Sequence, residues 1–462
     1  MDKQLMELLK KYNKRGSWYT DYPPLGLWEQ KVSDEEYKTA LTEFSVSSGD
    51  KPVFLYIHYP FCPKQCYYCM CFSEVSRSHK KSQEFLNHNG REVDMLNKLF
   101  EKNSFKPNIR KIHYGGGSPS WLNQEEFDIL DEQVSRLADK SNLEEIAIEV
   151  DPRTVTPEMM RHYHEKGINR ISFGVQDFDP EVQKAINRIQ PYEMVERLMS
   201  PEMRKLFNRG FNFDIIYGMP KQTVESFRKT IQQCIELSPD RLGVCILGWR
   251  PDIFKHQQKI NESDLPNFEE STEMQLESME MLLAAGYERI GIDHYAKPDE
   301  DLAVTKRQDK LHRSAMGYNP GDCVDMIGLG PSAMNRMQNY YFQKEYNIRR
   351  YNELVDAGKF PVFRGYKLNK DEQIRRDIME KIICYDRIDF DEIEKRYGIN
   401  FKEHFEYELN SFGELIQDGI IELSDRELTV TPTGTLFHRH VCTVFDELLR
   451  KGKGYKHARD SA

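Results

Sequence analysis

From residue 52 onward the chain alternates short apolar runs with longer amphipathic runs. The apolar runs have the length of buried strands, and the runs between them have the spacing of helices with one apolar face. This alternation predicts parallel strand–helix units rather than hairpins. We place the strands at 53–59, 110–115, 145–150, 170–175, 212–217 and 241–247. Helices are expected near 83–102, 124–139, 157–166, 180–186, 193–209 and 223–237.

Six such units predict an α/β fold built on a partial (βα)6 barrel, residues 51–250, with its chemistry at the carboxyl ends of the strands. Residues 1–50 are polar, and their aromatic segment 12–24 predicts an irregular arm, lying over the barrel mouth or simply packed against the barrel. Residues 251–365, with a helix near 267–285, are expected to extend the barrel on the substrate side.

The last part of the chain, residues 366–462, has a different composition and predicts a small, mostly helical domain. Helices are expected at 371–385, 389–396, 402–417 and 433–450, and a hairpin joins 420–423 to 428–430. This pattern resembles a winged helix. We interpret the unit as a lid over the barrel rather than as a DNA-binding domain.

Composition narrows the class of protein. The 462 residues are 39% hydrophobic and 30% charged with a formal net charge of −10, which favours a globular protein and disfavours a nucleic-acid binder that works by bulk charge. No apolar run is long enough to span a membrane, and the N-terminus has no secretory pattern, so a cytoplasmic location is expected. Oligomeric state is not readable, and we take a monomer as the default.

Four of the nine cysteines lie within ten residues, and Cys62, Cys66 and Cys69 form a C-x3-C-x2-C run. Three thiolates at this spacing, directly after an apolar strand, can hold three irons of a [4Fe–4S] cluster and leave the fourth iron open. S-adenosylmethionine can chelate that iron, and one-electron reduction then gives a 5′-deoxyadenosyl radical. A structural zinc site is the alternative, but zinc sites usually need a second, distant Cys/His pair, and none has that spacing here.

Polar residues follow the later strands where each is expected to end. Gly115, Gly116, Gly117 and Ser118 come after the second strand, and glycines allow close backbone approach to a ligand with free N–H groups. Carboxylates suit the amino group and ribose of S-adenosylmethionine, and an arginine suits its carboxylate. Each residue alone also fits an ordinary strand end; together they favour a ligand site. The polar residues that follow or lie in the later strands are Glu149, Asp151, Gln176, Asp177, Arg188 and Asp214.

The chain resembles the oxygen-independent coproporphyrinogen III oxidases of the radical S-adenosylmethionine superfamily. The resemblance covers nearly the whole length. It rests on Tyr19-Thr20-x-Tyr22-Pro23, the four-cysteine run, Gly115–Gly117, 148–152, 174–178, 214–223, Asp293-His294, 374–377 and Val430-Thr431-x-x-Gly434.

The resemblance implies that Cys62, Cys66 and Cys69 ligate the cluster and that Cys71 is an additional family cysteine. It implies cofactor contacts at Tyr56, Tyr68, Gly116, Gly117, Ser118, Glu149, Gln176, Arg188 and Asp214. The implied reaction converts two propionates of coproporphyrinogen III to vinyls. It uses one or two molecules of S-adenosylmethionine and a one-electron reductant such as flavodoxin or ferredoxin. Possible substrate contacts are Tyr19, Tyr22, Cys71, Arg250 and His294.

Three segments depart from the family pattern, and all are on the substrate side. The family commonly has an arginine where this chain has Trp18, with Arg15 nearby, and the other departures are 247–251 and 317–321. Two alternatives therefore stay open: a related radical enzyme acting on another tetrapyrrole or small molecule, by methyl or adenosyl transfer or haem ring opening, and a haem chaperone. The aromatic arm and Cys71 disfavour the chaperone.

Overall fold

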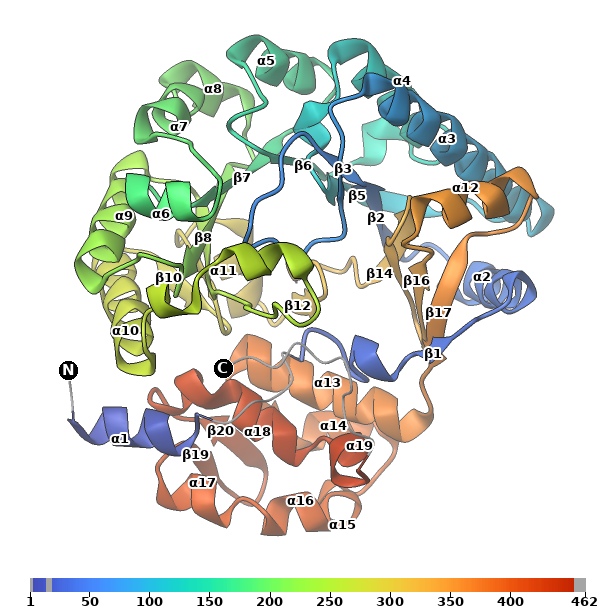
Figure 1. Cartoon of the computed structure of the whole chain (residues 1–462). Coiled ribbons are helices and arrows are strands. Elements are labelled where there is room, and N and C mark those ends of the chain that lie inside the picture. The colour runs from blue at the N-terminus through green and yellow to red at the C-terminus, as the bar shows by residue number, and fades with distance from the viewer. Residues whose placement is uncertain (1–2, 14–18, 453–462) are drawn as a thin grey trace.

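A computed structural model describes residues 3–13 and 19–452 of the chain. Its core is a sheet whose central strands are parallel and curve into an open barrel (Figure 1). The six predicted strands are confirmed: β2 (Pro52–Tyr59), β5 (Asn108–Gly116), β6 (Glu145–Val150), β7 (Arg170–Gln176), β8 (Phe211–Tyr217) and β9 (Arg241–Ile246). They are hydrogen-bonded in this order, all parallel.

The helices cover the convex side of the sheet, as Figure 1 shows for α3 (His79–Lys102), α4 (Gln124–Ser135), α5 (Pro157–Glu165) and α9 (Val224–Leu237). The outward side chains of the strands are apolar and form one core with these helices. The predicted helix 193–209 is wrong as a single element. It is split into α7 (Tyr192–Leu198) and α8 (Pro201–Leu206), because Pro201 has no N–H to continue the helix and Ser200 caps a new one.

The sheet extends past the six predicted strands at both edges. At one edge β14 (Asp325–Leu329) pairs parallel to β2, followed by antiparallel β15 (Met334–Met337), β16 (Tyr340–Lys344), β17 (Val362–Lys367) and β1 (Glu29–Gln30). At the other edge β11 (His294–Ala296) and β10 (Glu288–Ile290) pair antiparallel to β9. These strands are short, so their own sequence pattern is weak and tertiary pairing decides them.

Two helices lie outside the six strand–helix units, and the hydrophobic pattern predicted one of them but not the other. Helix α10 (Phe268–Ala284) confirms the prediction near 267–285. Helix α2 (Asp34–Ser48) was not predicted, although Ser33 begins a capping box and the buried Tyr37, Leu41 and Phe44 lie on one face. Helices α11 (Asp301–Arg307) and α12 (Ile348–Asp356) follow α10 along the chain.

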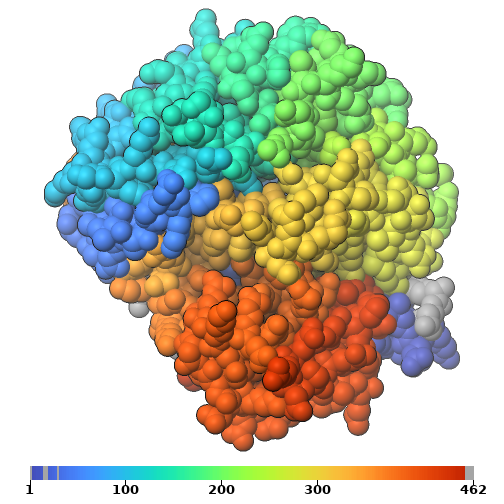
Figure 2. All heavy atoms as spheres, turned by 180° about the vertical axis from the view of Figure 1, so that it is seen from behind, coloured from blue at the N-terminus to red at the C-terminus, as the bar shows by residue number. Residues whose placement is uncertain are grey.

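The C-terminal part forms a separate unit below the barrel (Figures 1 and 2). Helices α13 (Lys370–Tyr385) and α14 (Phe390–Tyr397) and the hairpin β19 (Ile421–Leu423)–β20 (Glu427–Val430) confirm the prediction, and β18 (Arg387–Asp389) adds a third strand. The single helices predicted at 402–417 and 433–450 are wrong. Each is broken into short pieces: α15 (Phe401–His404), α16 (Glu406–Asn410), α17 (Gly413–Gln417), η6 (Gly434–Phe437), α18 (His438–Val444) and α19 (Glu447–Arg450).

The N-terminal segment packs on this C-terminal unit. Helix α1 (Lys3–Lys11) leads to Tyr12, whose hydroxyl donates to Asp418 at 2.6 Å. Tyr19 donates its hydroxyl to Asp446 at 2.9 Å, and Tyr22 is buried in the same apolar cluster. These aromatic side chains therefore pack against the C-terminal domain. The domain boundaries given above stay predictions, and Arg15 and Trp18 lie outside the described residues.

Candidate functional site

The cysteine loop leaves the carboxyl end of β2 and is anchored at several points. The short strand β3 (Phe61–Cys62) pairs with β4 (Glu74–Val75) and closes the loop at its base. Inside it, the backbone N–H of Tyr67 donates to the carbonyl of Ile186 at 3.0 Å. The side-chain amide of Gln257 donates to the carbonyl of Tyr68 at 2.9 Å. The loop is thus fixed by residues from three other parts of the chain.

Two guanidinium groups face the central cysteine. Arg153 Nη2 lies 3.3 Å and Arg188 Nη1 lies 3.5 Å from Cys66 Sγ. Both arginines also bond Asp151, at 2.6 Å and 3.1 Å. Burial raises the pKa of Asp151, but Arg188 and Arg153 outweigh it and lower that pKa to about 2. Two cationic side chains therefore lie beside the sulfur of Cys66.

The other two cysteines, Cys62 and Cys69, are half-buried, whereas Cys66 is buried. Burial raises the pKa of Cys62 to about 12, and a hydrogen bond to Cys71 together with burial raises the pKa of Cys69 well above its ordinary value. A bound metal deprotonates such thiols outright. Within the described ranges no three His, Cys, Asp or Glu side chains are gathered for a single metal ion. Cys71 is exposed and contacts Cys69 through that hydrogen bond.

The glycine loop after β5 packs tightly against the end of β2. A Cβ on Gly117 would lie 2.7 Å from the carbonyl oxygen of Phe61, so only glycine fits. Gly116 has φ +107°, which also favours glycine. The expectation that the loop frees its N–H groups is wrong. Gly116 N donates to Glu149, Gly117 N to Tyr59 and Ser118 N to Phe61, because these bonds hold the strand ends together.

The strand-end carboxylates are brought close together inside the barrel. Glu149 accepts from His113 Nε2 at 3.0 Å and from Gly116 N at 3.1 Å. Burial raises its pKa, but these hydrogen bonds outweigh burial, so the pKa of Glu149 is lowered. Burial raises the pKa of Asp214, with the charge of Glu149 adding to the effect against a hydrogen bond from Asn212. The two carboxylates therefore differ in how readily they hold a proton.

Gln176 and Arg188 complete the set at the strand ends. Gln176 has φ +68°, and its buried Oε1 has no hydrogen-bond partner among the described residues. That orphaned acceptor fits a ligand that donates a hydrogen bond. Arg188 is instead held within the protein, since it also donates to the carbonyl of Gly174 at 2.6 Å and to Gln190 at 3.0 Å. A contact between Arg188 and a cofactor carboxylate stays a prediction.

The remaining predicted residues lie in different places. Tyr56 donates to or accepts from His58 Nδ1 at 3.0 Å inside the barrel, and Tyr68 packs against Val182, Ile186 and Met219. His294 bonds Asp293 through Nδ1 at 2.7 Å. Arg250 pairs with Asp252 at 3.0 Å. Substrate contacts at Arg250, His294 and Cys71 stay predictions.

Comparison with known proteins identifies the family. The model of the radical SAM superfamily matches residues 56–234, and the model of the HemN C-terminal domain matches 368–437. The oxygen-independent coproporphyrinogen III oxidase of Salmonella typhimurium is 35% identical over 446 residues, covering 96% of both chains. That of Escherichia coli is 34% identical at the same coverage. This chain belongs to the oxygen-independent coproporphyrinogen III oxidase family. It is therefore a radical SAM enzyme.

The solved structure of coproporphyrinogen III oxidase (HemN) from Escherichia coli has the same fold. It superposes with a TM-score of 0.88 at 33% identity, covering 96% of this chain and 98% of that one. Membership of the superfamily implies a [4Fe–4S] cluster and S-adenosylmethionine. The residues present fit both groups: three cysteines in one anchored loop, a cationic pair at Cys66, and the orphaned Gln176 Oε1. No helix in the described part of this family member meets the length and hydropathy of a membrane span.

The inside of the barrel is polar, which the sequence reading missed. Inward polar side chains alternate with apolar outward ones along β7, where Arg170 and Ser172 line the inside and Ile171 and Phe173 belong to the outer core. This period of two was visible in the sequence, but the strands were interpreted only as apolar. A cavity of about 110 Å³ lies between these polar side chains. Its lining includes His113, Glu145, Glu149, Arg170, Ser172, Asn212, Asp214, Arg241 and His294.

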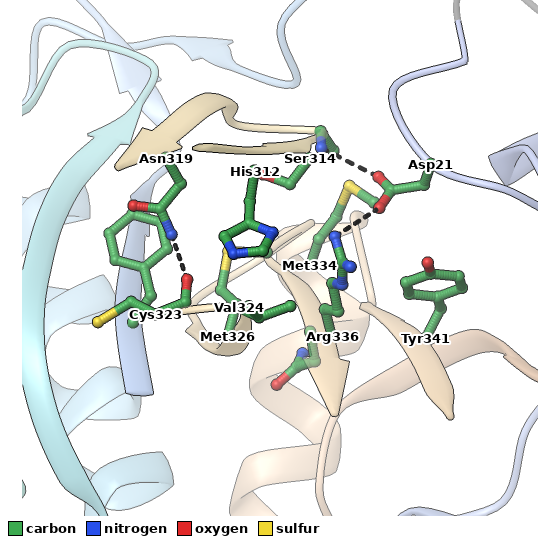
Figure 3. Close-up of a pocket in the computed structure, with 13 residues that line it drawn as sticks. Asp21, His312, Ser314, Asn319, Cys323, Val324, Met326, Met334, Arg336 and Tyr341 are labelled. Carbon is green, nitrogen blue, oxygen red and sulfur yellow. Dashed lines mark hydrogen bonds and ion pairs between the residues drawn. The ribbon is translucent and has the colours of Figure 1, made fainter. Parts of the chain in front are cut away.

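A second, smaller cavity lies where the barrel meets the N-terminal segment (Figure 3). Its volume of about 10 Å³ is room for roughly one water molecule. Asp21 enters this cavity, accepts from the Ala315 N–H at 3.0 Å and lies 4.0 Å from Arg336 Nη1. Burial raises the pKa of Asp21 to about 6, against the charge of Arg336. The charges of Arg336 and Arg376 therefore do not offset the burial of Asp21, so its pKa stays raised.

We expect Asp21→Asn to stabilise the chain relative to the wild type by an amount that grows between about pH 4 and pH 6 and stays level from there to pH 8. Because the folded pKa of about 6 exceeds the ordinary 3.8, Asp21 contributes stability below pH 4, and that contribution is lost as pH rises through 6. Two pKa units correspond to at most about 3 kcal/mol. The measurement is the thermal midpoint of the variant minus that of the wild type across this range. A difference that does not change with pH would contradict the prediction.

Proposed function

We propose that this chain oxidatively decarboxylates two propionate side chains of coproporphyrinogen III to vinyl groups, giving protoporphyrinogen IX without oxygen. The observation that carries the proposal is similarity from end to end: 96% of this chain and 96% of the Salmonella typhimurium enzyme align, including the C-terminal domain. A shared barrel alone would support only radical chemistry, since one fold hosts many activities.

The cluster and S-adenosylmethionine, when bound, supply the radical that takes a hydrogen atom from the β-carbon of a propionate. Each propionate arm then loses carbon dioxide and passes one electron to an acceptor, and a double bond forms between the two remaining carbons. The residues of the chain supply the environment of the cofactor and the substrate. Glu149 and Asp214 offer acceptors to donors on cofactor or substrate, and Tyr68 packs against Val182, Ile186 and Met219 beside the loop.

Two further partners belong to the proposal. A small one-electron carrier such as flavodoxin or ferredoxin is proposed to reduce the cluster. A second S-adenosylmethionine is proposed because two propionates must each lose a hydrogen atom.

A related radical enzyme acting on another tetrapyrrole is the second candidate. It is favoured by one observation: the departing segment 317–321 includes Gly317, Tyr318, Asn319 and Pro320, which all line the barrel cavity. A change in this wall would alter what the cavity accepts without altering the cysteine loop.

The test is an anaerobic assay of the iron-reconstituted full chain with coproporphyrinogen III, S-adenosylmethionine and a reductant. We expect mass spectrometry to show the loss of two carbon dioxide units together with formation of 5′-deoxyadenosine. Deoxyadenosine without that mass loss would overturn the substrate and leave the radical chemistry intact. In that case, other tetrapyrroles assayed in the same way would test the second candidate.

A further inference from the structure

Exposed cations gather around the outer turn of the cysteine loop. Two of them contact the loop directly: Arg77 Nε donates to the carbonyl of Pro63 at 3.4 Å, and Lys259 Nζ lies 4.9 Å from the centre of the Tyr67 ring. Five exposed cations of this region have no carboxylate partner among the described residues. They are Lys64, Arg77, Lys80, Lys255 and Lys259. Because the whole chain has a formal net charge of −10, this excess of positive charge is local.

The nearby carboxylates do not cancel these five charges. In the two segments that carry the cations, 60–81 and 250–264, every acidic residue except Glu262 already pairs with a basic residue outside the five. Five cations against this one carboxylate leave four positive charges. The neighbouring helix α6 (Pro180–Ala185) adds one glutamate and one lysine, so it leaves the balance unchanged.

Two exposed apolar side chains border the same part of the loop. Val75 is 48% exposed and pairs in register with Cys62. Ile189 is 49% exposed and lies two residues after Asn187, whose side-chain amide donates to the carbonyl of Gln65 at 2.8 Å. Exposed apolar side chains among charged ones are the composition of a small, transient protein interface. We call the five cations with Val75 and Ile189 the loop face.

The loop face differs from the side of the cysteine loop that packs on the barrel. Tyr68 packs against the apolar cluster that includes Met219, and Met70 contacts Gly248. Lys64, between the first two cysteines of the run, is instead exposed to solvent. A protein bound on the loop face would therefore lie beside the cysteines without entering the barrel.

We propose that the loop face docks an acidic one-electron carrier protein, which reduces the cluster held by the cysteine loop. This role rests on the proposed function, because the radical chemistry of S-adenosylmethionine consumes one electron for each cleavage. In the docked complex the carrier is oxidised by one electron and the cluster, when bound, is reduced by one; no bond forms or breaks and no proton moves. Complementary charge steers such partners together and raises the rate at which they associate.

The test measures how fast a reduced plant-type ferredoxin with an acidic surface reduces the reconstituted holoenzyme. Freeze-quench EPR separates the [4Fe–4S] signal of the holoenzyme from the [2Fe–2S] signal of the carrier. We expect Lys64→Glu with Arg77→Glu to slow this reduction at least about 10-fold at low salt, the lower end of what electrostatic steering contributes. The wild-type rate should fall as salt is added, because salt screens exposed charges, and the variant rate should change little.

Two controls separate docking from other effects of the substitutions. Dithionite needs no docking surface, so it should reduce wild type and variant at rates within threefold of each other. Lys98→Glu with Lys106→Glu makes the same change of charge at exposed lysines without a carboxylate partner among the described residues. Lys98 lies roughly 27 Å along α3 from Lys80, and this control should keep the wild-type rate with ferredoxin within twofold. Equal slowing in the control would overturn the loop face, since overall charge would then be the cause.

A second variant, Lys255→Glu with Lys259→Glu, tests the other half of the loop face and should slow reduction by ferredoxin in the same way. Variants of both halves that are reduced as fast as the wild type overturn the docking surface. So do variants that keep the ferredoxin rate but bind coproporphyrin III 10-fold more weakly in a fluorescence titration, since the cations would then serve the substrate.

Reduction of the holoenzyme needs no substrate, so failure of the docking surface and failure of the proposed function are distinguishable. Wild-type chain that converts coproporphyrinogen III, with variants reduced at the wild-type rate, overturns the docking surface alone. Wild-type chain that ferredoxin reduces faster than it reduces the variants, but that leaves coproporphyrinogen III unconverted, overturns the substrate and supports the docking surface.

Discussion

We expect the Cys66→Ser chain, reconstituted with iron and sulfide without air, to hold almost no cluster and to cleave no S-adenosylmethionine. A hydroxyl is a poor replacement for a thiolate, and the remaining two cysteines of the loop leave the cluster with too few ligands. The loss should be complete within detection, because Cys66 is the cysteine that Arg153 and Arg188 face. Iron content, the visible absorbance of the cluster and deoxyadenosine formation measure the effect.

Cys71→Ser is the matched control for this experiment. Cys71 belongs to the same loop and is exposed, and the family resemblance assigns it no iron. We expect its variant to keep about the same iron content as the wild type. The reverse pattern, with iron kept after Cys66→Ser and lost after Cys71→Ser, would show that the ligand set has been assigned wrongly. Zinc in place of iron in the anaerobically purified wild type would remove the basis of the radical chemistry.

We expect Lys344→Met to cause the largest loss of stability of any single substitution discussed here. Lys344 Nζ lies 2.8 Å from Glu92 Oε1, and both side chains are 0% exposed. Burial lowers the pKa of Lys344, but Glu92 outweighs it, so the lysine stays charged. Removing one partner of a buried ion pair leaves a lone charge and costs about 3–5 kcal/mol. The thermal midpoint of the barrel should fall by several degrees.

Two further variants show whether the loss comes from the lone carboxylate. Glu92→Gln with Lys344→Met leaves no buried charge, while Gln keeps an acceptor for Tyr351, which bonds Glu92 at 2.6 Å. This double variant should recover most of the stability. Lys10→Met breaks an exposed pair with Glu269 and should leave the thermal midpoint nearly unchanged, because solvent screens such pairs. A double variant no more stable than Lys344→Met would mean that the charge of Glu92 is not the cause.

The match between sequence and structure differs from one region to the next. Strands of the barrel were predicted within a few residues, because each is a run of outward apolar side chains between amphipathic helices, as at Ile146 and Ile148. The break before Pro201 was readable and was overlooked. Strands such as β10 and β11 were not readable, because three residues carry too little pattern and pairing with β9 decides them.

The residues of the site likewise fall into two groups: those that the sequence predicted and those whose role only the structure revealed. The cysteine run is local, so its spacing alone indicated a cluster. The sequence did not indicate Arg153, because this residue lies 87 positions from Cys66 along the chain and reaches it only in the fold. Arg188 was named for a cofactor contact, whereas the structure adds bonds to Asp151, Gly174 and Gln190. Such roles depend on which strand ends become neighbours when the sheet curves.

The sequence by itself determined the strand–helix order, the three cysteines and the family, because these depend on spacing along the chain and on similarity over its whole length. Only the tertiary structure decided that Arg170 and Arg241 share one cavity with Glu149 and Asp214. It also decided that the N-terminal tyrosines pack on the C-terminal domain. The physical reason is that curvature of the sheet brings alternate residues of six strands to one interior, and no local pattern records that meeting.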